Sequence, residues 1–149
     1  MAGDGDLIKL YSQRILELTT QIPHLQRLDN PDATAFKRSP LCGSTVSIDL
    51  RLEDGRISDF GQDVKACALG QASAAISGAQ IIGRTRSEVE TARSQLRDML
   101  KSDGPVPDPP FDGFEVLEPA RDYKNRHASI MLTLDATLEA FDTALAATA

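Results

Sequence analysis

Two cysteines are the residues best suited to chemistry in this chain of 149 residues. Thiolates ligate zinc and iron–sulfur clusters, and they also accept sulfur from other thiol groups. A structural disulfide is not expected for a cytoplasmic protein of this size. The alternative is that Cys42 and Cys67 are buried as small hydrophobic side chains. The choice depends on the elements that position them.

A β-hairpin is expected between the two cysteines. Apolar and polar residues alternate from 45 to 52, which is typical of a strand with one buried face. Asp54-Gly55 follows and suits a tight hairpin turn. The residues from Arg56 to Lys65 are expected to return as the partner strand. Ile57 and Phe60 fall on opposite phases of this strand, so we predict a bulge near Gly61.

The hairpin predicts that the two sulfur atoms lie close together. Cys42 comes just before the first strand, and Cys67 comes just after the second. Because a hairpin returns the second strand to the beginning of the first, both thiols should lie at the same end of the sheet. Cys67 also opens a segment rich in Ala, Gly and Ser that is expected to be helical. The positive end of a helix favours a thiolate, so chemistry becomes the stronger interpretation.

The other elements complete an α+β pattern. We expect about four to five α-helices packed on a small antiparallel sheet of about three strands, in one domain covering residues 1–149. Periodicity and turn signals predict helices at about 6–20, 67–82 and 126–146, a helix opened by a capping box at 87–90, a short strand at 35–37 and a proline-rich loop at 103–110.

Composition and charge exclude several classes of function. The net charge of −6 is unfavourable for binding a phosphate backbone, so no nucleic-acid partner is expected. No apolar run approaches the roughly 20 residues that span a bilayer. The first residues lack the features of a signal peptide, which predicts a cytoplasmic protein. No P-loop, dinucleotide motif or Ser–His–Asp array is present, so the sequence does not indicate an enzyme.

The order of these motifs resembles the U-type iron–sulfur cluster assembly proteins, the IscU/SufU/NifU N-terminal domain family. The similar features are Cys42-Gly43 before a strand, the Asp54-Gly55 turn, Cys67 followed by a small-residue helix with Ala72-Ser73, and the tract Ile82-Gly83-Arg84-Thr85. The long proline-rich insertion before the last helix points to the SufU branch. The resemblance covers nearly the whole chain.

The resemblance implies a metal site with two altered positions. In the family, three cysteines and an aspartate surround one metal. Cys42 and Cys67 match the first two cysteines, whereas Ser44 stands in place of the aspartate and Ser129 in place of the third cysteine. A serine hydroxyl is a poor ligand at neutral pH because its proton is hard to remove. Zinc or an iron–sulfur cluster prefers about four soft or borderline ligands, so the site is degenerate.

Two residues of the last helix have alternative interpretations. His127 is a possible substitute ligand, although its register differs by roughly 100° from that of residue 128, where IscU-branch proteins carry a histidine. The alternative is a surface or helix-start histidine. Arg126 is a possible steering group for an anion or a persulfide, as the resemblance implies. The alternative is that Arg126 pairs with an acidic neighbour such as Asp122.

The resemblance implies a scaffold or sulfur-relay protein rather than an enzyme. Such a protein would accept sulfur from a cysteine desulfurase or hold a transient iron–sulfur cluster or zinc, with Cys42 and Cys67 as carriers. The alternative is a degenerate paralogue that keeps the fold and a partner surface but has lost metal, and that serves as a regulatory binding module.

Overall fold

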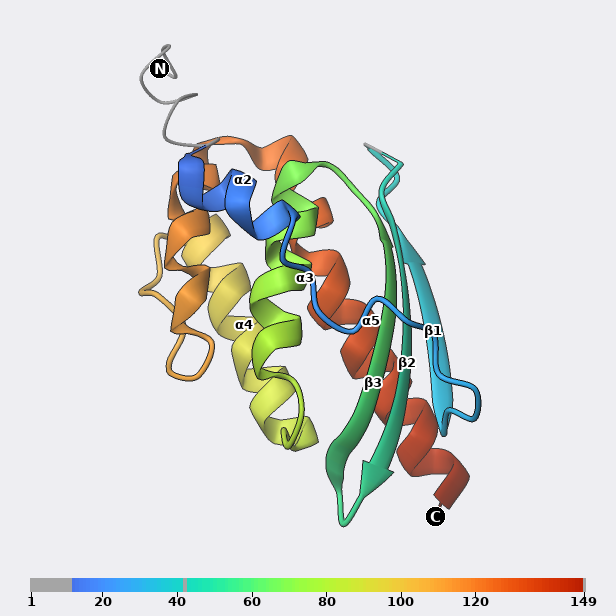
Figure 1. Cartoon of the computed structure of the whole chain (residues 1–149). Helices are drawn as coiled ribbons and strands as arrows, with labels where there is room; N and C mark the ends of the chain where they lie inside the picture. The colour runs from blue at the N-terminus through green and yellow to red at the C-terminus, as the bar shows by residue number, and fades with distance from the viewer. Residues whose placement is uncertain (1–11, 42, 149) are drawn as a thin grey trace.

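The computed structural model describes residues 12–41 and 43–148, which form three strands, four α-helices and one 3-10 helix. The described elements are α2 (Gln13–Thr19), β1 (Ala33–Arg38), β2 (Thr45–Glu53), β3 (Arg56–Lys65), α3 (Ala68–Gln80), α4 (Arg86–Lys101), η1 (Asp112–Asp122) and α5 (Lys124–Thr148). The helices lie on one face of the sheet (Figure 1). The expected α+β fold is therefore confirmed.

The predicted hairpin forms the centre and one edge of an antiparallel sheet with the order β1-β2-β3. Val46, Ile48 and Leu50 are buried against the helices, as the alternation predicted. The expected short strand before the hairpin is the full edge strand β1, which pairs with β2 from Ala33 to Arg38.

The bulge lies nearer the turn than predicted. Arg51 pairs with Asp59 and Leu52 pairs with Ile57, so Ser58 is the extra residue in β3. The predicted position at Gly61 is wrong, because a bulge must fall between Ile57 and Phe60 to bring both side chains to one face. Both are buried.

The last helix, α5, is the central helix of the core. It packs against β1 and β2 on one side and against α3 and α4 on the other. Figure 1 shows α3 and α5 beside the sheet, with α4 and η1 farther out. No helix within the described residues is long and apolar enough to cross a membrane.

The start of α4 differs from the prediction by two residues. Thr85, rather than Ser87, is the N-cap, and its capping-box partner is Glu88. Tertiary hydrogen bonds explain why the helix begins at this point. The Ile57 amide donates to the Arg84 carbonyl and the Gly83 amide donates to the Ile57 carbonyl, which holds this segment extended beside the start of β3. The helix therefore begins only at Arg86.

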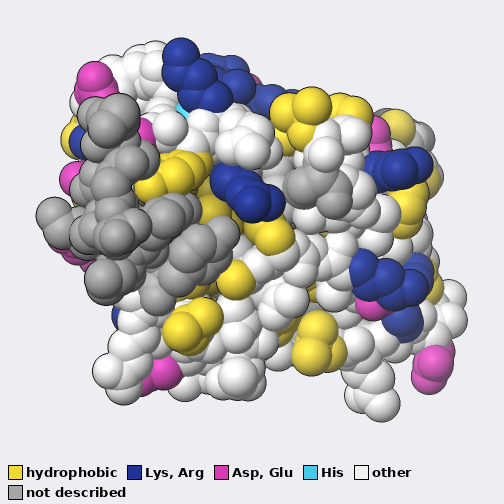
Figure 2. All heavy atoms as spheres, turned by 90° about the horizontal axis from the view of Figure 1, so that it is seen from above, with side chains coloured by type: hydrophobic (Ala, Val, Ile, Leu, Met, Phe, Trp, Pro, Cys, Tyr) yellow, Lys and Arg dark blue, Asp and Glu magenta, His cyan; other side chains and the backbone are white. Residues whose placement is uncertain are grey.

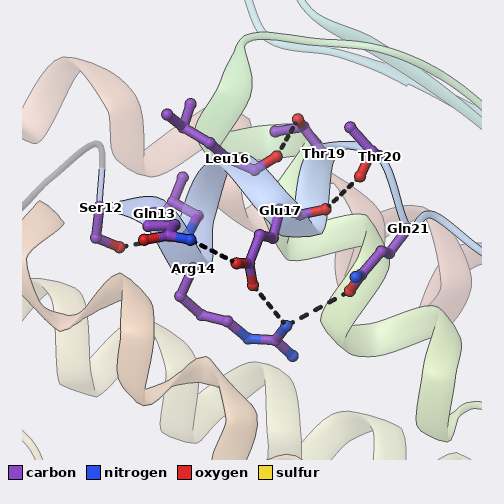
Figure 3. A network of polar contacts seen from close by, with 9 residues as sticks. Ser12, Gln13, Arg14, Leu16, Glu17, Thr19, Thr20 and Gln21 are labelled. Carbon is purple, nitrogen blue, oxygen red and sulfur yellow. Dashed lines mark hydrogen bonds and ion pairs between the residues drawn. The ribbon is translucent and has the colours of Figure 1, made fainter.

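Local hydrogen bonds hold the short helix α2 (Figure 3). The Ile15 amide donates to the Ser12 hydroxyl at 3.3 Å, which caps the first turn. Gln13 and Arg14 both contact Glu17 one turn later. The earlier part of the predicted opening helix, residues 6–11, lies outside the described residues.

Residues 20–32 form a strap that crosses from α2 to β1 over the polar face of the sheet. The Gln62 amide donates to the His24 carbonyl at the free edge of β3. The strap then passes over Gly61, where a Cβ would lie 2.5 Å from the Gln26 carbonyl oxygen. Only a residue without a side chain permits this close approach.

A buried carboxylate fixes the strap to the sheet. Asp49 on β2 is only 1% exposed and accepts two hydrogen bonds from Arg27, at 2.6 and 2.9 Å. It also accepts from the Leu28 amide at 3.1 Å and from the Thr34 hydroxyl at 2.6 Å. Four donors on one carboxylate compensate for its burial. These bonds lower the pKa of Asp49, chiefly through Arg27.

Asp49→Asn is expected to lower the free energy of unfolding by about 3 kcal/mol, because it replaces a charged acceptor with a neutral amide. Urea unfolding at neutral pH measures the change. Asp59→Asn, at an exposed position of the neighbouring strand, is the matched control and is expected to change stability by less than about 0.5 kcal/mol.

Asp49→Asn is also expected to make the free energy of unfolding less dependent on pH in the acidic range. In the folded protein the pKa of Asp49 is depressed, so its stabilising contribution is complete above the unfolded value of about 4. The contribution is lost as the pH falls through the folded pKa. Wild type should therefore lose more stability than Asp49→Asn on acidification, and equal losses would contradict this assignment.

Candidate functional site

Three of the four positions that match the family's ligands meet at one end of the sheet. Ser44 immediately precedes β2, Cys67 is the N-cap residue of α3, and Ser129 lies in the second turn of α5. Ser44 and Ser129 are buried, with 3% and 1% of their surface exposed, whereas Cys67 is half-buried. Residues 85 positions apart are thus brought into direct contact.

Hydrogen bonds join these three residues into a closed triangle. The Ser129 hydroxyl donates to Ser44 Oγ at 3.1 Å, and the Cys67 amide donates to the same oxygen at 3.4 Å. The Cys67 Sγ and Ser129 Oγ atoms lie 3.4 Å apart. The sulfur is therefore next to a hydroxyl whose proton points toward another oxygen.

The small-residue helix α3 makes this contact possible. A Cβ at Gly70 would lie 2.6 Å from Ser129 Oγ and 2.8 Å from the Ala66 Cβ. Gly70 therefore lets the first turn of α3 approach α5 closely enough for Cys67 to contact Ser129. The sequence predicted close packing of this helix, but it did not single out Gly70.

Cys42 lies outside the described residues, so the predicted closeness of its sulfur to that of Cys67 stays a prediction. The residues on either side are described. The Ser39 amide donates to the Ser44 carbonyl at 2.8 Å, and the Gly43 amide donates to the Ser39 carbonyl at 3.0 Å. Gly43 has a φ of +71°, which a glycine adopts without strain.

His127 points away from the serines and Cys67. Its Nε2 atom lies 2.9 Å from the Ala120 carbonyl oxygen and 3.1 Å from that of Arg121, both in η1. The alternative of a surface histidine is wrong, because only 4% of the residue is exposed. The helix-start interpretation fits, since His127 lies in the first turn of α5. Its contacts tie η1 to α5.

Arg126 is half-buried in the first turn of α5, three residues before Ser129. Its amide donates to the Tyr123 carbonyl at 2.9 Å. Within residues 12–41 and 43–148 no ion pair joins its guanidinium to Asp122. Pairing with that carboxylate, the alternative role for Arg126, is therefore not observed.

The donors that the structure describes at this site, Cys67, Ser44 and Ser129, do not by themselves fit a resident metal. Among the described residues no group of three His, Cys, Asp or Glu side chains could hold a metal ion. At the position of the family's site, Cys67 is the one described thiol, and its neighbours are two hydroxyls that bond to one another. Zinc and iron–sulfur clusters require about four thiolate, imidazole or carboxylate ligands.

The surface around the site is basic although the chain is acidic overall. Figure 2 views the end of the molecule where α3 and α5 begin, and it shows Lys and Arg side chains there with hydrophobic side chains between them. Arg38 is the last residue of β1 and Lys65 is the last residue of β3, and both lie at this end of the sheet. Leu41 is 73% exposed in the loop before Ser44.

Comparison with known proteins supports the resemblance. No family model matches the chain. A solved structure of the N-terminal part of a nitrogen-fixing NifU-like protein from Brucella abortus superposes with a TM-score of 0.92 at 42% identity, over 95% of this chain and 98% of that one. The IscU iron–sulfur cluster assembly scaffold of Thermotoga maritima is 24% identical over 94 residues, which are 63% of this chain and 66% of that protein.

A third similarity concerns the fold alone. A candidate scaffold protein of the SUF system from Fervidobacterium islandicum superposes with a TM-score of 0.79 at 19% identity, over 90% of this chain and 98% of that one. The SufU branch, which the proline-rich insertion indicated, therefore stays a prediction. The chain belongs to the U-type iron–sulfur assembly proteins, the IscU/SufU/NifU N-terminal domain family.

Proposed function

We propose that this chain is an iron–sulfur cluster assembly protein that accepts sulfur as a persulfide on Cys67. The observation that carries the proposal is the position of Cys67: it is half-buried, it is the N-cap residue of α3, and its sulfur lies 3.4 Å from the Ser129 hydroxyl oxygen. Proteins of the U-type are scaffolds rather than enzymes. Cys42, which matches the first family cysteine, is proposed as the second sulfur carrier.

The chemistry requires only a thiolate and a persulfide donor. The thiolate of Cys67 attacks the terminal sulfur of a persulfide on the partner, the S–S bond of that persulfide breaks, and the partner's cysteine leaves as a thiolate. The transferred sulfur keeps its proton or releases it to water. The start of α3 favours the negative charge that develops on Cys67, because the helix dipole is positive there.

A cysteine desulfurase is the proposed partner. Leu41 is exposed, and Arg38 and Lys65 lie at the same end of the sheet. These residues support docking of a partner surface that is apolar and has acidic groups around it. Arg126 is proposed to attract the persulfide anion, a role for which its place one turn before Ser129 is suited.

A second candidate function is a degenerate binding module that has lost both metal and sulfur chemistry. The observation that favours it is the serine pair, since Ser44 and Ser129 satisfy one another without a metal. Cys67 would then be a half-buried apolar side chain.

Sulfur transfer separates the two candidates. Purified protein is incubated with a cysteine desulfurase and free cysteine, and the intact mass is measured before and after reduction. We expect a mass increase corresponding to at least one sulfur atom, which a reductant removes and which Cys67→Ser largely abolishes. An unchanged mass, with no cluster formed on reconstitution, would support the binding module.

A further inference from the structure

We propose that the outer edge of β1 pairs with β1 of a second copy of this chain, so that two three-stranded sheets join into one continuous antiparallel sheet. This inference goes beyond the proposed function and does not depend on it. It rests on the outward-facing backbone groups of β1, on the coverage of the opposite sheet edge, and on the charges at the two ends of the strand.

The hydrogen-bond pattern between β1 and β2 determines which backbone groups of β1 face outward. The Ser39 amide donates to the Ser44 carbonyl, and this pair continues the register of the two strands. Because bonded pairs alternate along an antiparallel ladder, the odd-numbered residues of β1 bond to β2. The amide and carbonyl groups of Thr34, Phe36 and Arg38 therefore face the outer edge. Among the described residues no backbone group outside the sheet bonds to them.

The opposite edge of the sheet, along β3, is already covered. The Gln62 amide donates to the His24 carbonyl of the strap, and the Ile57 amide donates to the Arg84 carbonyl before α4. Within the part of the chain that the structure describes, β1 is thus the open edge, on the outer side of the sheet (Figure 1). Because each copy offers one open edge, pairing through it closes at two copies and does not continue into a fibre.

The side chains of β1 are complementary to themselves in one register. A twofold axis at Ala35 places Thr34 of each copy opposite Phe36 of the other, and these two residues exchange hydrogen bonds between their outward amide and carbonyl groups. The same axis places Asp32 of each copy opposite Arg38 of the other, on one face of the joined sheet. Both are exposed, and opposite charges at directly facing positions stabilise a strand pair.

The charges at the ends of the strand select this register. Shifting the axis to Thr34 or to Phe36, the next registers that align the outward groups, moves Asp32 away from Arg38. The carboxylate of Asp32 is held beside β2, because it accepts from the Leu52 amide at 2.7 Å. Within residues 12–41 and 43–148 no ion pair engages Arg38, so its guanidinium is available to a second copy.

The pairing also covers an exposed aromatic ring and leaves the sulfur site open. Phe36 is 60% exposed on the face of the sheet away from the helices. In the twofold register the two Phe36 rings are diagonal neighbours across the paired strands, a separation that aromatic side chains span. The antiparallel arrangement places the two Cys67 residues at opposite ends of the joined sheet, where each stays accessible.

Sedimentation of the full chain over a range of concentrations measures the association. We expect a reversible equilibrium between monomer and dimer within about 1–100 μM, the affinity of a small interface. Phe36→Pro removes an outward amide hydrogen without removing a bond to β2, so it should yield folded monomers. Phe36→Val keeps that amide and is the matched control, with association weakened by at most about tenfold.

Charge reversal tests the register. Arg38→Glu places two carboxylates opposite one another in a dimer, and Asp32→Lys places two cations opposite one another. Each variant alone is therefore expected to associate about tenfold or more weakly than wild type. An equimolar mixture of the two variants restores both pairs of opposite charges, so it should form a heterodimer with an affinity near that of wild type.

Association of the mixture, with neither variant associating comparably alone, supports the proposal. A wild type that is monomeric at about 100 μM would overturn it. The same conclusion follows if Phe36→Pro, shown to be folded by circular dichroism, dimerises like wild type, or if the mixture associates no better than its components. If Phe36→Pro does not fold, the mixture of charge-reversal variants decides alone.

Discussion

Replacing Ser44 by Asp and Ser129 by Cys together is expected to create a zinc site that binds at least about a hundredfold more tightly than wild type. The two substitutions restore the family's donors beside Cys67. Ligand-supporting residues alone change metal affinity by about 10–100-fold, so two direct ligands should exceed this range. The carboxylate and the thiolate also supply the negative charge that a divalent cation requires, which two hydroxyls do not.

Competition with a chromophoric zinc chelator measures the affinity. Ser44→Asp and Ser129→Cys alone are the matched controls and should each give an intermediate affinity. Adding Cys67→Ser to the double variant should remove most of the gain, which ties the new site to this thiol. Tight zinc binding by wild type, equal to that of the double variant, would contradict our conclusion that the serine-containing donor set does not fit a metal.

The largest effect on stability is expected for Ile48→Pro, which should leave the chain unfolded. Ile48 lies in the central strand, with partners at Ala35 on β1 and Gln62 on β3. It is fully buried against the helices. Proline lacks the amide hydrogen and clashes within a paired strand, so the substitution disrupts the sheet and its core contacts together.

Ile48→Val provides the matched control, because it keeps the backbone amide and removes one methylene group. We expect it to lower the free energy of unfolding by about 1 kcal/mol. Circular dichroism and thermal unfolding distinguish the two variants. A cooperative transition near that of wild type in Ile48→Pro would show that residue 48 does not lie in a central paired strand.

The hairpin could be predicted because its information is local. Apolar residues alternate along β2, and Asp54-Gly55 supplies the turn, with φ values of +53° and +76°. The bulge at Ser58 was misplaced although the opposite phases of Ile57 and Phe60 require it between them. The start of α4 was misplaced because it depends on tertiary contacts. The pairing of residues 83–85 with the start of β3 selects Thr85 over an equally good capping sequence two residues later.

In the candidate site, too, some features could be predicted from the sequence and others depend on tertiary contacts. The order of motifs was enough to place Cys67, Ser44 and Ser129 at matching family positions. It did not show that the serines are buried and bond to one another, since that depends on how closely α3 approaches α5 at Gly70. Likewise, the burial of His127 follows from the two carbonyl groups of η1 that meet its ring, which no local pattern encodes.

The most direct test of a metal-independent sulfur acceptor is peptide mapping of the persulfide in protein freed of metal by a chelator. After incubation with a desulfurase and cysteine, the persulfide is trapped with an alkylating reagent and located by mass spectrometry. We expect it on the peptide that contains Cys67, at a similar level with and without added zinc. Modification confined to Cys42, or sulfur uptake only when metal is present, would contradict the account.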